Sequence, residues 1–314
     1  PAAALLGELI CDPVTYHGRF VPEYFESEKT NLLEAIRSLI NDKRDWADSR
    51  LLRALCDGEA YAVPRLGDEE TVDKLQALKV YTQYRDLIST APLEIIYSGS
   101  ADLERVKQAL AAAFATLPRE EVRVISTAAP HVCRESVQHV EDVLDVTQGK
   151  LGMGFSCGSD DMPALLMGNT LFGGSSNSKL FLNVREKLSL CYYASSLYHR
   201  QKGLITVSSG IEFQNYQRAY DEIMAQLEAV QKGELEDWEL EGARSTLLNS
   251  YATVGDSQGK LENFYLGQAA TGQHETPADL ARAIQDMTAE RICRAMSTVK
   301  LDTVYFLKGK EVEA

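Results

Sequence analysis

The sequence has few cysteines and places none of them in a C-x-x-C pair. The six are scattered along 314 residues, and several have apolar neighbours. This spacing provides neither a disulfide framework nor a cysteine-based metal cluster, and it predicts reduced, mostly buried thiols in a cytoplasmic protein. The cysteines are Cys11, Cys56, Cys133, Cys157, Cys191 and Cys293.

The sequence also lacks a long hydrophobic run and an excess of positive charge. No apolar stretch reaches the ~18 residues that a membrane-spanning helix needs. The formal net charge of −14 argues against nucleic acid or an anionic membrane surface as a partner. An acidic surface is compatible with basic peptides, although such charge also keeps proteins soluble without any specific partner. We therefore expect a cytoplasmic protein with no nucleic acid and no membrane among its partners.

The pattern of apolar residues predicts an α+β protein of two domains, divided as residues 1–119, 120–142 and 143–314. The first segment is helix-rich with one strand at 93–99, and the second is a charged linker or edge strand. The third alternates blocks of strands and helices and includes a hairpin, which indicates helices on one face of a mixed or antiparallel sheet. Helices are expected at 5–11, 23–44, 45–55, 69–86, 101–114, 160–172, 213–232, 234–254, 255–271 and 276–298, and strands at 150–155, 191–199, 203–211 and 303–308.

Residues 173–192 combine a glycine turn, a helix that ends in charged residues, and an Arg/Tyr pair. Arg185 and Tyr192 are seven residues apart, which is two turns of an unbroken helix and would put both side chains on one face. Arg185 offers a fixed fork of donors and Tyr192 a single hydroxyl donor, a pair suited to holding a carbonyl or an oxyanion. The alternative interpretation is a capped surface helix followed by an interfacial tyrosine.

The wider segment 171–193 resembles the second domain of the pitrilysin or insulinase family of zinc peptidases, which includes mitochondrial processing peptidase and insulin-degrading enzyme. Its sequence is LFGGSSNSKLFLNVREKLSLCYY. The resemblance implies two α/β sandwich domains, of which the first would be incomplete here. It also implies that Arg185 and Tyr192 contact the main chain of a peptide substrate near the zinc ion.

Four neighbouring residues are further candidates for substrate binding. Gly173, Gly174 and Ser175 form the turn before the helix, and Tyr193 follows Tyr192. Each also has a simpler interpretation. The turn residues can reverse the chain and cap the helix, and a tyrosine in a strand commonly packs at a core or an edge.

A second segment, residues 20–34, resembles the family's helix of the form Glu-x-Glu-Lys/Arg. Its sequence is FVPEYFESEKTNLLE, and Glu26 falls on the position of the third zinc ligand. The alternative is that Glu26 is a solvated charge in the first turn of an amphipathic helix, where the helix dipole favours acidic residues.

The histidine pattern excludes the family's catalytic zinc site from this stretch of chain. Active members carry H-x-x-E-H, with two His ligands and a Glu base, and none of the five histidines has that spacing. Glu26 alone cannot hold catalytic zinc, because such sites use about three protein ligands. We therefore expect no cofactor in the chain alone and no peptide hydrolysis by it. The histidines are His17, His131, His139, His199 and His274.

Three explanations of this absence remain open. The favoured one is a non-catalytic subunit, similar to bacterial partner-type members of the family. Such a subunit pairs with an H-x-x-E-H subunit, whose zinc ion acts on a peptide substrate, or it forms a homo-oligomer. The second is a C-terminal fragment of an active zinc metalloendopeptidase whose motif lies upstream, in which case Glu26 is a metal ligand. The third is a scaffold or interaction protein that keeps the fold without assisting catalysis.

Overall fold

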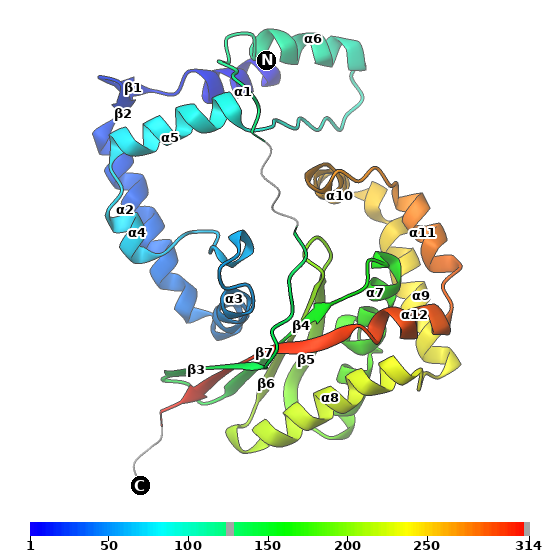
Figure 1. Cartoon of the computed structure of the whole chain (residues 1–314). Helices are drawn as coiled ribbons and strands as arrows, with labels where there is room; N and C mark the ends of the chain where they lie inside the picture. Colours follow the sequence, from blue (N-terminus) through cyan, green and yellow to red (C-terminus); the bar gives the residue numbers. More distant parts are fainter. Residues whose placement is uncertain (124–128, 311–314) are drawn as a thin grey trace. The chain divides into compact units, whose positions relative to one another are not determined.

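The computed structural model describes residues 1–123 and 129–310 (Figure 1). The chain forms two compact units. Unit 1 comprises Pro1–Leu39 and Arg65–Ser126, and unit 2 comprises Ile40–Pro64 and Thr127–Ala314. The domain limits 1–119, 120–142 and 143–314 stay a prediction.

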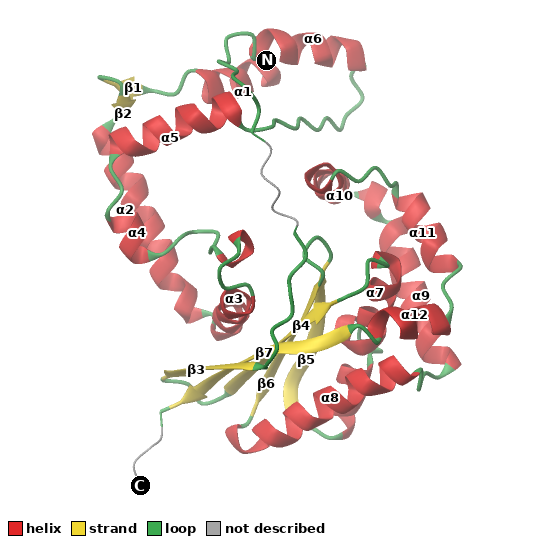
Figure 2. Ribbon diagram, viewed as in Figure 1, coloured by secondary structure: helices red, strands yellow, loops and turns green. Residues whose placement is uncertain are grey.

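Unit 2 is built on a five-stranded mixed sheet with strand order β3-β7-β4-β6-β5 (Figure 2). The strands are β3 Gln138–Leu144, β4 Gly149–Cys157, β5 Cys191–His199, β6 Leu204–Ile211 and β7 Val299–Gly309. β3 and β7 run parallel, and every other neighbouring pair is antiparallel. The predicted α+β class and mixed sheet are confirmed.

One face of this sheet supports the main hydrophobic core. Val304 and Phe306 of β7 and Phe155 of β4 pack there with apolar residues of the surrounding helices. Phe155 meets Phe172 edge to face, with ring centroids 6.3 Å apart. The helices of this unit are α7 Met162–Asn169, α8 Tyr216–Lys232, α9 Asp237–Ala252, α10 Gln258–Thr271, α11 Pro277–Gln285 and α12 Ala289–Met296, with π-helices at Thr170–Gly174 and Leu180–Lys187 and short 3-10 turns at Ala60–Ala62, Phe213–Asn215 and Val254–Asp256.

Helix α3, Lys43–Leu55, covers the opposite face, a layer that the sequence pattern does not predict. Tyr305 and Leu307 alternate with the core residues of β7 and pack against it. Two glycines of β4, which have no side chains, allow α3 to come close to the sheet. A methyl group added at Gly152 would lie 3.2 Å from Leu51, and one at Gly154 would lie 2.7 Å from Leu55. The sheet is therefore covered on both faces.

Unit 1 is mainly helical. It contains α1 Ala2–Cys11, α2 Pro22–Ser38, α4 Glu69–Asp73, α5 Ala77–Thr90 and α6 Leu103–Ala113, with a small hairpin of β1 Thr15–Tyr16 and β2 Arg19–Phe20. The strand predicted at 93–99 is wrong. No described segment pairs with it, and Leu93 and Ile95 are half-exposed. Apolar residues alone do not make a strand, because its backbone groups need a neighbouring ladder.

Several predicted helices are divided by local hydrogen bonds. The helix expected at 23–44 ends at Ser38 and continues as a 3-10 turn, Leu39–Asn41. Asp42 then starts α3 by accepting the backbone N–H groups of Arg44 and Asp45 at 2.9 and 3.0 Å. Thr288 similarly starts α12, so the helix predicted at 276–298 is two helices. None of the helices in residues 1–123 and 129–310 is long and apolar enough to cross a membrane.

A buried ion pair fixes the start of the π-helix Leu180–Lys187. The ammonium of Lys179 lies 3.0 Å from each carboxylate oxygen of Glu239 on α9. Both side chains are more than nine-tenths buried. Glu239 also accepts the backbone N–H of Glu236 at 2.9 Å, which caps α9.

We expect Lys179→Met to lower the free energy of unfolding by about 3–5 kcal/mol, because it leaves the Glu239 carboxylate buried without its cation. Lys187→Met, at the exposed end of the same helix, is the matched control and should change stability by less than about 0.5 kcal/mol. Urea unfolding followed by circular dichroism measures both. Equal midpoints for the two variants would show that the pair does not anchor the helix.

Candidate functional site

The π-helix Leu180–Lys187 and strand β5 position the predicted Arg/Tyr pair. The helix closes with wide turns, in which Leu188 N–H donates to Asn183 O at 3.1 Å and Leu190 N–H to Val184 O at 3.0 Å. Ser189 adopts φ 50°, a left-handed conformation uncommon for a residue other than glycine. The chain therefore reverses before β5, and Tyr192 lies on a strand. The two-turn helical geometry expected from the spacing does not occur.

A β-bulge sets the position of Tyr192. Cys191 lies opposite Ile211 of β6, whereas Tyr193 lies opposite Gly210, so the register shifts at Tyr192. A bulge leaves one residue without a cross-strand partner and redirects its side chain. Tyr192 points outward, with 58% of its surface exposed.

Arg185 and Tyr192 line one pocket of about 420 Å³ despite the interrupted helix. The pocket lies within unit 2, next to the start of the edge strand β5. Its lining residues are Arg185, Glu186, Ser189, Leu190, Cys191, Tyr192, Glu212 and Asn215.

The guanidinium of Arg185 keeps most of its donors available. It lies over the Phe181 ring, 4.7 Å from the centroid, and 3.4 Å from the carboxylate of the adjacent Glu186. Such an exposed ion pair contributes little free energy. Among the described residues, no hydrogen bond uses the Arg185 side chain. The ring contact orients the guanidinium without consuming its N–H groups.

Glu212 is a pocket residue that sequence reasoning missed. Its carboxylate accepts a hydrogen bond from the Tyr192 hydroxyl. This bond, with the negative charge of Glu212, raises the pKa of Tyr192 above its ordinary range. The sequence placed Glu212 directly after the predicted strand 203–211. The structure pairs the end of that strand with the start of β5, which brings Glu212 near Tyr192.

The pocket also contains a thiol, Cys191. Burial raises its pKa to about 11, although the positive charge of Arg185 acts in the opposite direction. The reactive form of cysteine is the thiolate. Cys191 therefore remains protonated near neutral pH and does not act as a nucleophile.

Gly173, Gly174 and Ser175 do not line this pocket. A methyl group added at Gly173 would lie 2.7 Å from the backbone nitrogen of Ser196, so the glycine allows the π-helix Thr170–Gly174 to approach β5. The Ser175 hydroxyl donates to Thr170 O at 3.3 Å. These contacts give the turn a packing role, and its contribution to substrate binding stays a prediction.

Tyr193 is also separate from the pocket lining. Its ring covers Gly210 on β6, where an added methyl group would lie 2.5 Å from the ring, and the Arg44 guanidinium lies 4.4 Å from its centroid. Arg44 belongs to α3, so Tyr193 faces the side of the sheet that α3 covers. Its role in substrate binding stays a prediction too.

Glu26 is exposed on α2 in unit 1. Its backbone oxygen accepts the Thr30 hydroxyl at 2.9 Å, and no histidine or cysteine joins it in any group of potential metal ligands in the part of the chain described. The residues present do not fit the family's zinc ion, because one carboxylate cannot replace three ligands.

Comparison with known proteins identifies the family. The family model described as peptidase M16 inactive domain matches residues 74–247. A Bacillus subtilis (strain 168) relative named "Probable inactive metalloprotease YmfF" is 35% identical over 314 residues, which cover 98% of this chain and 72% of the relative.

Solved structures give the same result for the fold. A conserved protein from Enterococcus faecalis V583 superposes with a TM-score of 0.88 at 25% identity, covering 100% of this chain and 75% of that chain. The peptidase M16 inactive domain from Pseudomonas fluorescens superposes with a TM-score of 0.81 at 18% identity, covering 99% and 75%. The chain belongs to the peptidase M16 family, the pitrilysin-type peptidases that its sequence resembles.

Proposed function

We propose that this chain is a non-catalytic peptidase M16 subunit that pairs with an H-x-x-E-H subunit and supplies Arg185 and Tyr192 to bind the peptide carbonyl. The observation that carries the proposal is the pocket of about 420 Å³ that Arg185 and Tyr192 both line. The relative named an inactive metalloprotease supports the non-catalytic part. Two further relatives are named zinc proteases, which supports zinc in the partner subunit.

The pocket offers both kinds of hydrogen-bonding group that a peptide main chain requires. Arg185 donates to a carbonyl or to the oxyanion that forms from it, and Glu212 accepts a peptide N–H. A peptide N–H on Glu212 would release the Tyr192 hydroxyl to donate to the substrate. One donor aimed at an oxyanion contributes ~2.7–4 kcal/mol to transition-state stabilisation.

The edge position of β5 supports binding of an extended peptide. β5 ends the sheet order and pairs with β6 on one side, and no other described strand pairs with it. A peptide that adds as a further strand would gain main-chain hydrogen bonds. The start of this edge lies at the pocket, so such a peptide would pass Tyr192. The six cysteines are free, which supports a reducing compartment such as the cytoplasm.

We expect Arg185→Ala to lower kcat of the assembled pair by about 100-fold or more, because the carbonyl loses a charged donor in the transition state. The chain would be mixed with a peptidase M16 subunit that carries H-x-x-E-H, and cleavage of a fluorogenic peptide would be measured. Arg218→Ala, which removes an exposed arginine of α8 outside the pocket, is the control and should cleave at the wild-type rate.

The other outcomes identify the alternatives. Wild-type cleavage by the Arg185→Ala pair, with assembly intact by size-exclusion chromatography, would favour a scaffold role. Failure of the two chains to associate, with the chain isolated as a homo-oligomer, would contradict the partner assignment. Hydrolysis by a longer form of this chain alone, with its own upstream H-x-x-E-H motif, would make it part of an active protease and Glu26 a metal ligand.

We expect Glu212→Gln to move the alkaline limb of the kcat/KM profile of the pair to lower pH. Glu212 raises the pKa of Tyr192, and only the protonated hydroxyl donates, so loss of the carboxylate ends donation at a lower pH. In the Tyr192→Phe background, Glu212→Gln should produce no further shift, because no phenol remains to titrate. An identical shift in both backgrounds would assign the limb to another group.

A further inference from the structure

A second cluster of reactive side chains lies in unit 2 and shares no residue with the Arg185 pocket. One potential ligand atom from each of Cys56, Glu59 and His131 lies within 4.8 Å of the other two. Cys56 is fully buried, and the His131 side chain is 4% exposed. Sulfur, nitrogen and carboxylate oxygen are the three ligand types of zinc sites in proteins.

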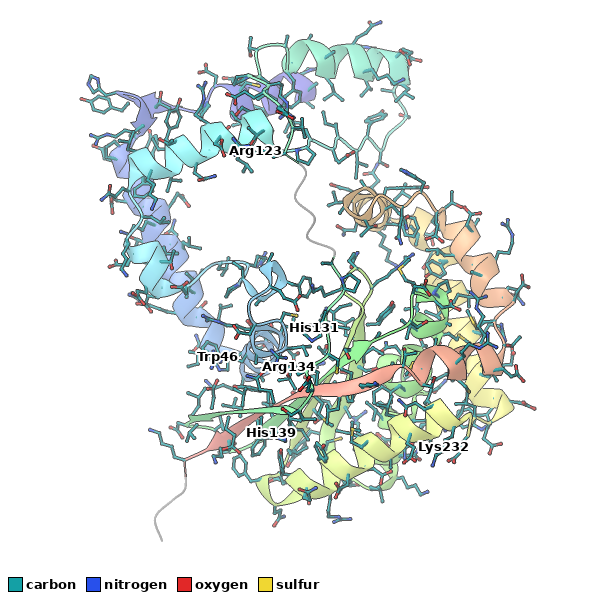
Figure 3. All side chains as sticks on the ribbon, in the orientation of Figure 1. Trp46, Arg123, His131, Arg134, His139 and Lys232 are labelled. Atoms are coloured by element: carbon teal, nitrogen blue, oxygen red, sulfur yellow. The ribbon has the colours of Figure 1, made fainter. Side chains whose placement is uncertain are left out.

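Two segments distant in sequence build this cluster. Cys56 follows α3 directly, and the turn after it, closed by Glu59 N–H donating to Cys56 O at 2.9 Å, brings Glu59 beside it. His131 is 72 residues beyond Glu59, and its backbone N–H donates to Lys202 O at 3.3 Å. Figure 3 shows His131 and its neighbour Arg134 beside α3 and the sheet. Spacing rules applied to the cysteines could not reveal this grouping.

The histidine has the supporting contacts of a metal ligand. Its Nδ1 lies 2.5 Å from Glu59 Oε1, whereas its Nε2 lies 3.2 Å from Asp302 Oδ2. Asp302 is fully buried and accepts the backbone N–H of Arg134 at 2.7 Å and the Thr303 hydroxyl at 2.8 Å. Metal-binding histidines commonly donate their second N–H to a carboxylate, which fixes the ring and its tautomer.

The neighbouring cations have carboxylate partners of their own. Lys202 pairs with the second oxygen of Glu59, and the Arg134 guanidinium lies 2.5 Å from the other oxygen of Asp302. Glu59 Oε1 and His131 Nδ1 thus remain for an ion. The hydrogen bond between these two atoms holds one proton. A divalent ion that replaced this proton and the thiol proton of Cys56 would leave the net charge of the cluster unchanged.

We propose that Cys56, Glu59 and His131 bind a zinc ion, with Asp302 as the positioning residue of His131. Zinc bonds of about 2.0–2.3 Å place tetrahedral ligand atoms roughly 3.3–3.7 Å apart. The Glu59–His131 pair must therefore open by about 1 Å, a change that side-chain rotation can supply. Three protein ligands leave one coordination position for water. The ion would join the end of α3 to the segment that carries His131.

The test is metal binding by the full chain, first stripped with a chelator and then titrated with Co²⁺ and Zn²⁺. We expect one equivalent of Co²⁺ to produce a sulfur-to-metal charge-transfer absorption that Zn²⁺ abolishes, and we expect Zn²⁺ to raise Tm, because an ion that binds only the folded state stabilises it. Cys56→Ala should lose both effects. Cys157→Ala is the matched control, since that cysteine is also buried and no described His or carboxylate shares a ligand group with it.

Asp302→Asn separates positioning from ligation. It should weaken zinc binding by about 10- to 100-fold while the sulfur absorption is retained at saturating Co²⁺. Absence of a stoichiometric sulfur absorption in the wild-type chain would overturn the proposal. Its survival in Cys56→Ala, or its equal loss in a folded Cys157→Ala, would overturn it as well.

Discussion

The sheet of unit 2 must bury both of its faces, and the rest of that unit depends on this constraint. Alternate residues of β7 meet this requirement, because Val304 and Phe306 enter the main core while Tyr305 and Leu307 meet α3. The β4 glycines then allow α3 to approach at backbone distance. Once α3 is held in this way, its C-terminal end lies at a fixed place beside β7, where Cys56 and Glu59 meet the groups around Asp302. Packing therefore determines where the polar chemistry of this face can occur.

The edge strand β5 determines the position of the Arg185 pocket. At β5 the sheet has no further described strand, and the bulge at Tyr192 turns its side chain outward. The buried Lys179–Glu239 pair anchors the beginning of the π-helix that carries Arg185. Removal of either partner would leave a buried charge, so the pair imposes one position on the helix. The backbone position of Arg185 is therefore fixed, and the contact of its guanidinium with the Phe181 ring restricts the side chain further.

The sequence allowed prediction of the elements that local patterns specify. The hairpin of β5 and β6 was predicted almost residue by residue, since its apolar runs and its turn are local signals. The predicted strand at 93–99 failed because pairing is not local. The side of the sheet that Tyr193 occupies also depends on the bulge. The 171–193 motif predicted Arg185 and Tyr192 as a pair, yet Glu212 could be recognised only when the register of β5 and β6 placed it beside Tyr192. The Cys56 cluster required two segments that are distant in sequence to meet.

The residues of the Arg185 pocket support the proposal that this chain binds the substrate carbonyl while another subunit activates the attacking water. Hydrolysis of a peptide bond requires an activated nucleophile as well as stabilisation of the oxyanion. The pocket supplies hydrogen-bond donors and an acceptor, but its thiol, Cys191, keeps its proton because burial raises its pKa to about 11. The guanidinium of Arg185 offers only donors and cannot serve as a base. Glu212 is already hydrogen-bonded to Tyr192. These groups can hold a carbonyl in place, and in the proposed pair the attacking water would be activated by the H-x-x-E-H motif of the other subunit.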